Sequence, residues 1–512
     1  MTRLTGRFAA ASLAVLTACA VSAACGGTSR PATQGTAGAG GGAVLRFAYT
    51  AFPSTLDPHK ASTAWDELYI LPVYDRLVTV KPDGRIAPMI AESWRKDGQK
   101  IVFAIRSGAR FHDGAALDAE AVRANLDRAM NGKGSTAKPL LKMIESVKAS
   151  AGTVTIAFTG SEQDLLNALA HRGGALISPK AFDKPDLDRA PVGSGPYQVT
   201  TYRRDDRVVY QPFAAYYDKG AQRLGGLEMS FVNEDDTRLN GVRSGQYDAT
   251  LIRPEQVDTA RDAGLKVNEF LTGLVYQLNL NTARSKFADP RVRQALNHAV
   301  DRRAITEKLL LNSCQPTVQP APSGHWAHEP SLESAYPHDP AKARRLLAEA
   351  GVGDGFSFTA LVWNNTAFVQ LGEALQDQFK AVGVDMRLRP MSADQSIDLY
   401  QNRGEADALV SQIGAAAADP RLITQQDYLK GGLNNPGDLS VPEIEKLAEQ
   451  VATVTDRSVQ QQSYREIVKL AADAAYNVPV CNRKLYFATN DKVRDFDKLL
   501  TGYDDIRVVG MG

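Results

Sequence analysis

The centre of the chain changes from a period of two to the period of a helix. Over residues 274–281, every second position holds a large apolar side chain: Leu274, Tyr276, Leu278 and Leu280. This alternation predicts a strand. An apolar stripe at helical spacing follows: Val292, Leu296, Ala299 and Val300. Asp289 suits the N-cap of that helix, and Pro290 suits its first position, where no N–H donor is needed. We expect the strand to leave one lobe and the helix to open a second.

Similar patterns along the rest of the chain predict an α/β protein. Strands are expected at 44–49, 101–106, 153–158, 227–231, 249–252, 358–362, 384–388, 406–412 and 477–481. Helices are expected at 164–170, 239–243, 339–351, 367–382 and 464–474, and another begins near Asp118, its expected cap. Alternating strands and helices favour α/β layers. A chain of 512 residues is too long for one core, so we expect two or three domains.

The N-terminal segment has the pattern of a secretory signal. Arg3 and Arg7 precede a short apolar run at residues 8–16, which is too short for a membrane span. Leu16-Thr17-Ala18-Cys19 is similar to the lipidation motif of bacterial lipoproteins, and a rival motif ends at Cys25, before two glycines. We expect Cys19 to carry the lipid, with Cys25 or a plain signal peptide as alternatives. Residues 26–43 are rich in Gly, Ala, Ser and Thr and predict a flexible tether.

Bulk composition excludes several other classes of protein. Hydrophobic residues make up 44% of the chain, charged residues 23%, and the net charge is +1, as in an ordinary soluble protein. No basic run suggests nucleic-acid binding, and no apolar stretch after residue 30 could span a bilayer. Cys314 and Cys481 lack Cys-x-x-Cys spacing, so a zinc site is not expected. Outside the cytoplasm they could form a disulfide, or they could be two separate buried thiols.

Several motifs together resemble one protein family. They are Asn281-Thr282 with Phe-x-Asp-x-Arg-Val-Arg-Gln-Ala-Leu-x-x-Ala-Val-Asp-Arg at 287–302, Phe-His-Asp-Gly at 111–114, Gly-Ser-Gly-Pro-Tyr at 193–197, and the helix at 339–351 that begins Asp-Pro and ends Ala-Gly. Their order and spacing resemble the extracellular solute-binding proteins of family 5, which are the peptide-, nickel- and oligosaccharide-binding components of ABC importers. The resemblance covers nearly all of residues 44–508.

The resemblance implies a fold and a domain plan. The fold would be the two-lobed α/β fold of periplasmic binding proteins, of class II and of the large type with an extra subdomain in the first lobe. The plan is a signal peptide at 1–18, a lipid-anchored linker at 19–43, a first lobe at 44–275 with a subdomain inserted at about 60–185, a second lobe at 276–478, and a return to the first lobe at 479–512.

Three features invite an enzymatic or metal-binding reading. Ser194 lies among glycines, but a nucleophile elbow needs Gly-x-Ser-x-Gly between a strand and a helix, and Pro196 here begins a strand. We expect instead a tight crossing where side chains do not fit. His112 beside Asp113 lacks the further ligands of a metal centre. His325 and His328 lie on a proline-rich loop without a carboxylate or thiol at matching spacing. We therefore expect no catalytic residue, metal or cofactor.

The resemblance also implies where a solute would bind. The expected ligand-binding residues lie at strand ends and in the loops that follow: Thr50, Phe52, Asn279, Trp363, Asn364, Asn365, Ile413, Gly414, Ala416 and Asp419. For Trp363 the alternative is that its ring covers the core of its own lobe. Peptide-binding relatives carry an aspartate at the position of Ala416, where it pairs with the α-ammonium of the peptide. A buried ammonium without that carboxylate would cost several kcal/mol. Binding of a free peptide N-terminus by the usual contact is therefore not expected.

The expected function is that of a binding lipoprotein on the outer face of the cell membrane. It would capture a peptide or similar small solute between two lobes, close by hinge motion, and deliver the solute to a permease with its ATPase. It would be a monomer held to the membrane by its lipid, with no nucleic-acid partner. The alternatives are a receptor or scavenger with the same fold, and a secreted hydrolase.

Overall fold

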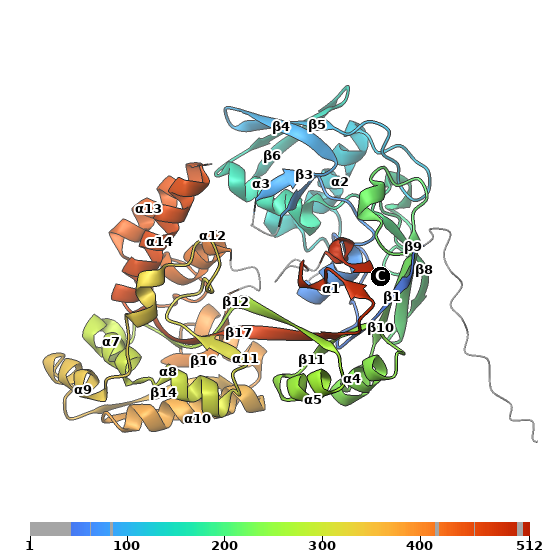
Figure 1. Cartoon of the computed structure of the whole chain (residues 1–512). Coiled ribbons are helices and arrows are strands. Elements are labelled where there is room, and N and C mark those ends of the chain that lie inside the picture. Colours follow the sequence, from blue (N-terminus) through green and yellow to red (C-terminus); the bar gives the residue numbers. More distant parts are fainter. Residues whose placement is uncertain (1–41, 62, 82–84, 415–418, 455, 499–504) are drawn as a thin grey trace, which may run out of the picture. The chain divides into compact units, whose positions relative to one another are not determined.

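The computed structural model describes residues 42–61, 63–81, 85–414, 419–454, 456–498 and 505–512 (Figure 1). These residues belong to one compact unit, Ala37–Gly512. The predictions for Cys19, Cys25 and the linker lie outside the described residues, and so does Ala416. No helix in the described part of the chain is long and apolar enough to cross a membrane.

One large mixed sheet of eleven strands runs through the protein. Its order is β15 (Val384–Met391), β14 (Phe356–Trp363), β16 (Ala408–Ile413), β12 (Lys266–Leu280), β17 (Asn477–Thr489), β11 (Ala249–Ile252), β1 (Val44–Tyr49), β10 (Gly226–Phe231), β9 (Arg207–Pro212) and β8 (Tyr197–Arg203). The short strand β13 (Cys314–Pro316) pairs with β17 outside this path. Parallel pairs on both sides of β12 and β17 give the mixed α/β architecture that the sequence predicts.

The two longest strands, β12 and β17, join the parts of this sheet. They pair antiparallel from Lys266 opposite Thr489 to Asn279 opposite Asn477 (Figure 1). Both are longer than predicted. The register of β12 shifts between Leu271 and Val275, so its buried face changes there. The apolar residues of β12 therefore do not alternate strictly along the whole strand, and its first part was not predicted. The polar residues after Cys481 conceal the second part of β17, which remains a strand because neighbours pair with it on both sides.

A second, four-stranded sheet has a core of its own. Its order is β4 (Ala91–Asp97), β5 (Lys100–Ile105), β7 (Thr153–Phe158) and β6 (Ile144–Ser150). The helices α2 (Ala119–Asn131) and α3 (Glu162–Ala170) contribute Leu126 and Leu169 to this core, where they join Phe103 and Phe158. This cluster is distinct from the two cores that flank the large sheet. Asp118 caps α2 as predicted, with its carboxylate accepting from Ala121 N at 2.9 Å.

The remaining helices cover the sheets or pack on one another. Before β12 they are α1 (Ala64–Ile70), α4 (Asp235–Arg243) and α5 (Val257–Asp262). After β12 the main ones are α7 (Pro290–Ala299), α9 (Pro340–Glu349), α10 (Thr366–Lys380), α11 (Ala393–Ile397), α12 (Pro420–Ile423), α13 (Pro442–Thr453) and α14 (Arg457–Asp473). The predicted start of α7 is confirmed, because Asp289 accepts a hydrogen bond from Arg291 N at 2.8 Å.

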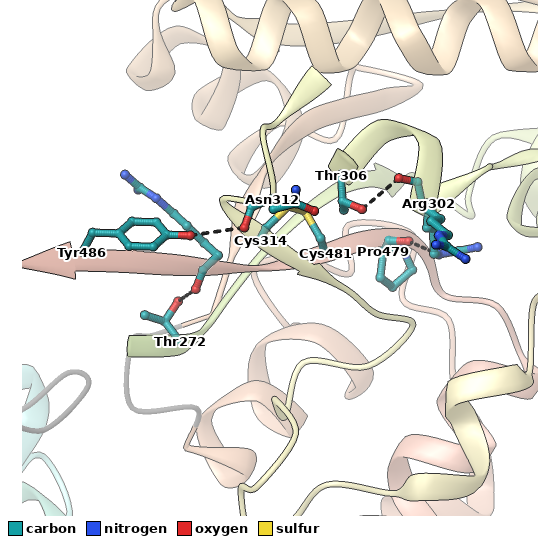
Figure 2. Close-up of a disulfide and its surroundings, with 10 residues drawn as sticks. Thr272, Arg302, Thr306, Asn312, Cys314, Pro479, Cys481 and Tyr486 are labelled. Atoms are coloured by element: carbon teal, nitrogen blue, oxygen red, sulfur yellow. Dashed lines mark hydrogen bonds between the residues drawn. A yellow bond between two sulfur atoms is a disulfide. The ribbon is translucent and has the colours of Figure 1, made fainter. Parts of the chain in front are cut away.

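The central motif after β12 is held by buried arginines. Arg293 on α7 donates to the carbonyl oxygens of Phe287 and Ala474, both at 2.6 Å. Arg302 donates to the carbonyl oxygen of Pro479 in β17 at 2.8 Å (Figure 2). Arg293 therefore fastens α7 to the end of α14, and Arg302 fastens the turn after α7 to the strand β17.

Cys314 and Cys481 form a disulfide, which decides between the two alternatives left by the sequence. Their Cα atoms are 5.6 Å apart, and the bond joins β13 to β17 (Figure 2). Both residues are buried. Beside it, the hydroxyl of Tyr486 donates to the carbonyl oxygen of Asn312 at 3.2 Å. The segment 312–316 is thus fixed along the middle of β17.

Candidate ligand-binding cavity

A cavity of about 550 Å³ lies beside the two long strands. Its lining comes from the ends of β1 and β11, the start of α4, both long strands, the start of α10 and the segment before β13: Thr50, Asp235, Arg238, Leu251, Ile252, Arg253, Pro254, Glu255, Tyr276, Leu309, Leu310, Ser313, Thr366, Ala367, Gln370, Arg483, Lys484, Leu485 and Tyr486. Residues before and after β12 in the chain therefore share one cavity of a size typical for small-molecule sites.

Most of the charges that line the cavity are already paired with protein groups. Arg238 donates to Asp235 and also to the carbonyl oxygen of Val232 at 2.7 Å. Arg253 lies 2.9 Å from the same Asp235 carboxylate. Lys484 lies 3.5 Å from Glu269 on the neighbouring strand. These four lining residues thus all have charged protein partners.

Arg483 and Glu255 are different from the other charged residues of the lining. The Arg483 guanidinium has a single side-chain hydrogen bond in the described chain, a long one of 3.5 Å to Gln412 Oε1. Glu255 forms no ion pair or hydrogen bond within the described residues. Arg483 is half-buried, whereas Glu255 is exposed. Within the described residues, the lining thus offers one cation and one carboxylate without a partner of opposite charge.

The predicted residues at the end of β1 take two different positions. Thr50 lines the cavity. Phe52 packs into an aromatic cluster, with ring centroids 6.0 Å from Tyr69, 5.4 Å from Tyr202 and 6.2 Å from Phe231. Its ring therefore contributes to the first core and is partly buried there. The structure does not bring Phe52 into the cavity lining.

The predicted residues Trp363, Asn364 and Asn365, at the end of β14, come directly before two residues that line the cavity. Trp363 packs its ring on Phe368 with centroids 4.9 Å apart and also contacts two hydrophobic clusters of the second part of the chain. Asn364 and Asn365 are exposed, and Asn365 caps α10 by accepting from Phe368 N at 3.2 Å. The next two residues, Thr366 and Ala367, line the cavity. Trp363 thus covers the core, while the asparagines lie next to the lining.

Asn279, Ile413 and Gly414 serve packing in the large sheet. Asn279 is 1% exposed, and its amide donates to Leu409 O at 3.1 Å and to Ser411 Oγ at 2.9 Å. Ile413 is buried opposite Val275. Gly414 has a φ of +88°, and a Cβ there would lie 2.2 Å from the carbonyl oxygen of Gly273. Only glycine fits this crossing of β16 over the irregular part of β12.

Asp419 belongs to a contact between distant parts of the chain. Its carboxylate caps α12 by accepting from Arg421 N at 2.9 Å, and it also lies 3.5 Å from the Arg421 guanidinium. Arg421 forms a second ion pair with Asp164 on α3, which packs against the four-stranded sheet. Burial raises the pKa of the Asp164 carboxyl, and the charge of Arg421 opposes that rise. Arg421 thus links the segment after β16 to the four-stranded subdomain.

The residues considered for catalysis are in structural positions. Ser194 is 1% exposed, and its hydroxyl accepts from Asp75 N at 3.3 Å. A Cβ at Gly193 or Gly195 would lie 2.1 or 2.6 Å from the backbone of Val73, so the prediction of a tight crossing is confirmed. Burial lowers the pKa of His112 to about 4, and this ring hydrogen bonds to Gly195 O at 3.0 Å.

The other candidate groups do not come together as a catalytic or metal-binding set. Asp113 accepts from the hydroxyl of Ser178 at 2.6 Å. His325 packs beside Trp326, and His328 pairs with Glu333 at 3.2 Å. Across the ranges that the structure describes, no group of three or more His, Cys, Asp or Glu residues is placed to hold a metal ion.

Comparison with known proteins places the chain in a family. Residues 85–435 match the model of the bacterial extracellular solute-binding proteins, family 5 Middle. The glutathione-binding protein GsiB of Salmonella typhimurium (strain LT2) is 31% identical over 366 residues, which cover 69% of this chain and 71% of that protein. The chain belongs to the family 5 extracellular solute-binding proteins, as the sequence motifs indicated. It is an extracytoplasmic solute-binding protein of the ABC-importer type and not an enzyme.

Solved structures share its fold at lower sequence identity. HbpA2 from Haemophilus parasuis superposes with a TM-score of 0.82 at 21% identity, covering 92% of this chain and all of that one. The periplasmic binding protein DppA from Helicobacter pylori, in complex with the peptide STSA, gives a TM-score of 0.74 at 21% identity and covers 92% of this chain and 98% of that one. The predicted two-lobed α/β fold of periplasmic binding proteins is thereby confirmed.

The cavity also contains residues that the sequence did not single out. Arg253 and Glu255 follow β11, and Arg483 lies inside a strand that was predicted to end at residue 481. Arg253 and Glu255 could have been selected as Thr50 was, because they are polar residues that follow the end of a strand, where ligands often bind. No local signal was available for Arg483, because only the pairing of β17 shows that it faces the cavity.

Proposed function

We propose that this protein captures a small peptide-like solute in the 550 Å³ cavity and delivers it to a membrane permease with its ATPase. The observation that carries the proposal is the shared lining of that cavity. Thr50 follows β1 and Ile252 ends β11, both before β12 in the chain. Thr366 and Gln370 come from the helix α10 after β12, and Arg483 comes from β17. A solute in this position would contact both parts of the chain, so it would favour the form in which they lie together.

The glutathione bound by GsiB and the peptide bound by DppA support the choice of solute class. Both are amino-acid derivatives with polar main chains. The cavity offers polar side chains beside apolar walls from Leu251, Ile252 and Leu485, which suits a solute of this kind. Thr50, Asn364 and Asn365 stay candidates for direct contact with the solute.

A thermal-shift screen tests this proposal. Glutathione, di- and tripeptides, nickel–histidine and oligosaccharides are each added to the purified protein. Binding to the native state alone raises the melting temperature, and a concentration of 100 times Kd adds about 2.7 kcal/mol. We expect a shift with glutathione or peptides. A shift only with sugars or the nickel complex would contradict the proposed solute class, and no shift with any compound would contradict the binding function.

We also propose that the mature protein is a monomer tethered to the outer face of the cell membrane through lipid on Cys19. The short leader with its lipidation motif supports the tether. Two acyl chains hold a protein stably on a membrane, whereas a single chain gives only marginal binding. The Cys19→Ala variant should leave the membrane fraction, whereas Cys25→Ala should remain there with an acylated N-terminus visible by mass spectrometry. The reverse result would assign the lipid to Cys25.

A further inference from the structure

The charges that line the cavity separate into paired and unpaired groups. Asp235, Arg238, Arg253 and Lys484 all have charged protein partners. Arg483 and Glu255 have none in the described part of the chain. A guanidinium has five N–H donors, and Arg483 uses one of them, for the long bond to Gln412. The unpaired groups are one cation and one anion within the same cavity.

Arg483 is also fixed in position by its backbone. Its carbonyl oxygen accepts from the hydroxyl of Thr272 at 2.8 Å, and its strand pairs with β13 opposite Cys314. The disulfide to Cys481 lies two residues away on the same strand. The backbone of Arg483 is thus held in place, so binding of a carboxylate orders only its side chain.

We infer that Arg483 and Glu255 determine which solutes this cavity accepts: Arg483 binds a carboxylate and Glu255 binds an ammonium group. The inference rests on the proposed function and narrows its solute class to zwitterions derived from amino acids. The carboxylate for the ammonium group would come from Glu255 in the segment after β11.

The two contacts should differ in strength. Arg483 is half-buried, and charge-assisted hydrogen bonds in such surroundings contribute a factor of about 10–100 in affinity. Glu255 is exposed to solvent, where an ion pair contributes a factor of about 2–5. Salt should weaken the Glu255 contact more than the Arg483 contact, because exposed charges are screened more strongly.

The test pairs each variant with a matched change in the solute. Glutathione and trialanine are each prepared in three forms: free, with carboxylates esterified, and with the amino group acetylated. Isothermal titration measures their Kd for the wild type, Arg483→Gln, Glu255→Gln and Arg303→Gln. The Arg303→Gln control makes the same change in net charge as Arg483→Gln but lies outside the cavity lining.

We expect Arg483→Gln to weaken the free form about 10–100-fold and leave the affinity for the ester unchanged, because the ester already lacks the charge that Arg483 binds. Glu255→Gln should weaken the free form about 2–5-fold and leave the acetylated form unchanged. Equal losses for all three solute forms would show a structural role and overturn the inference. Equal affinity of the wild type for the free, esterified and acetylated forms would also overturn the inference, while the proposed function would stand. Absence of binding by every form would overturn both.

Discussion

The ion pair between Arg507 and Asp75 should be among the most costly contacts to break in the first part of the chain. Arg507 is 8% exposed and Asp75 is fully buried. Arg507 Nη1 donates to Asp75 Oδ1 at 2.7 Å, and Nη2 donates to the carbonyl oxygens of Leu71 and Tyr74 at 2.7 and 2.8 Å. The pair thus fastens the C-terminal segment to the turn after α1.

Replacing Arg507 by Ala would leave the Asp75 charge buried without its main partner. Removal of one member of a buried pair costs about 3–5 kcal/mol. If the unit Ala37–Gly512 unfolds cooperatively, that cost corresponds to a fall in melting temperature of about 3–5 °C, because the unfolding entropy grows with chain length. Thermal and urea denaturation measure the loss. Arg303→Ala is the control, since the side chain of Arg303 is 82% exposed and pairs with Glu307 only at the surface. Its loss of stability should be close to the experimental error of the denaturation measurement.

The pH dependence separates the lost ion pair from a simple packing defect. Burial raises the pKa of Asp75 even in the wild type, and the loss of Arg507 should raise it further. A carboxyl with a raised folded-state pKa contributes stability at low pH that is lost as pH rises through that pKa. The deficit of Arg507→Ala should therefore shrink between pH 7 and pH 4. A deficit no larger than that of Arg303→Ala, or one that does not change with pH, would refute this reasoning.

Three further predictions concern other parts of the fold. Burial raises the pKa of Asp427 to about 7, so Asp427→Asn should gain stability over the wild type as pH rises from about 4 to 7 and hold that gain above it, by urea denaturation. Replacing Cys314 and Cys481 by serine should cost about 2–5 kcal/mol by the same method, because the bond closes a separation of 167 residues. Arg421→Ala should weaken solute binding about 2–10-fold in isothermal titration, since its ion pair with Asp164 would no longer favour the form in which both parts contact the solute. Unchanged values in these assays would count against the respective contacts.

Local sequence signals predicted the parts of the fold that depend on near neighbours. The caps of α7 by Asp289 and of α2 by Asp118 could be predicted, because an aspartate directly before a helix can accept a hydrogen bond from an N–H two or three residues later. The crossing at Gly193 and Gly195 could be predicted, because a glycine on each side of a serine indicates a place where larger side chains do not fit. The order of these motifs also indicated the family.

Contacts between distant residues could not be predicted in this way. Arg507 and Asp75 are 432 positions apart, and nothing in either segment indicates the other. Asn279 was predicted to contact the ligand at a strand end, yet its amide donates to Leu409 and Ser411 in β16. The disulfide stayed undecided for the same reason, because a pairing across 167 residues depends on where β13 meets β17.

We propose that the protein binds one zwitterionic, peptide-like solute and releases it unchanged. Native mass spectrometry of the protein mixed with glutathione or trialanine tests this most directly, followed by acid release and mass analysis of the recovered compound. We expect one solute per chain, recovered with its original mass, and a lower occupancy in Arg483→Gln. A recovered compound with an altered mass, or equal occupancy in the wild type and Arg483→Gln at concentrations near Kd, would contradict it.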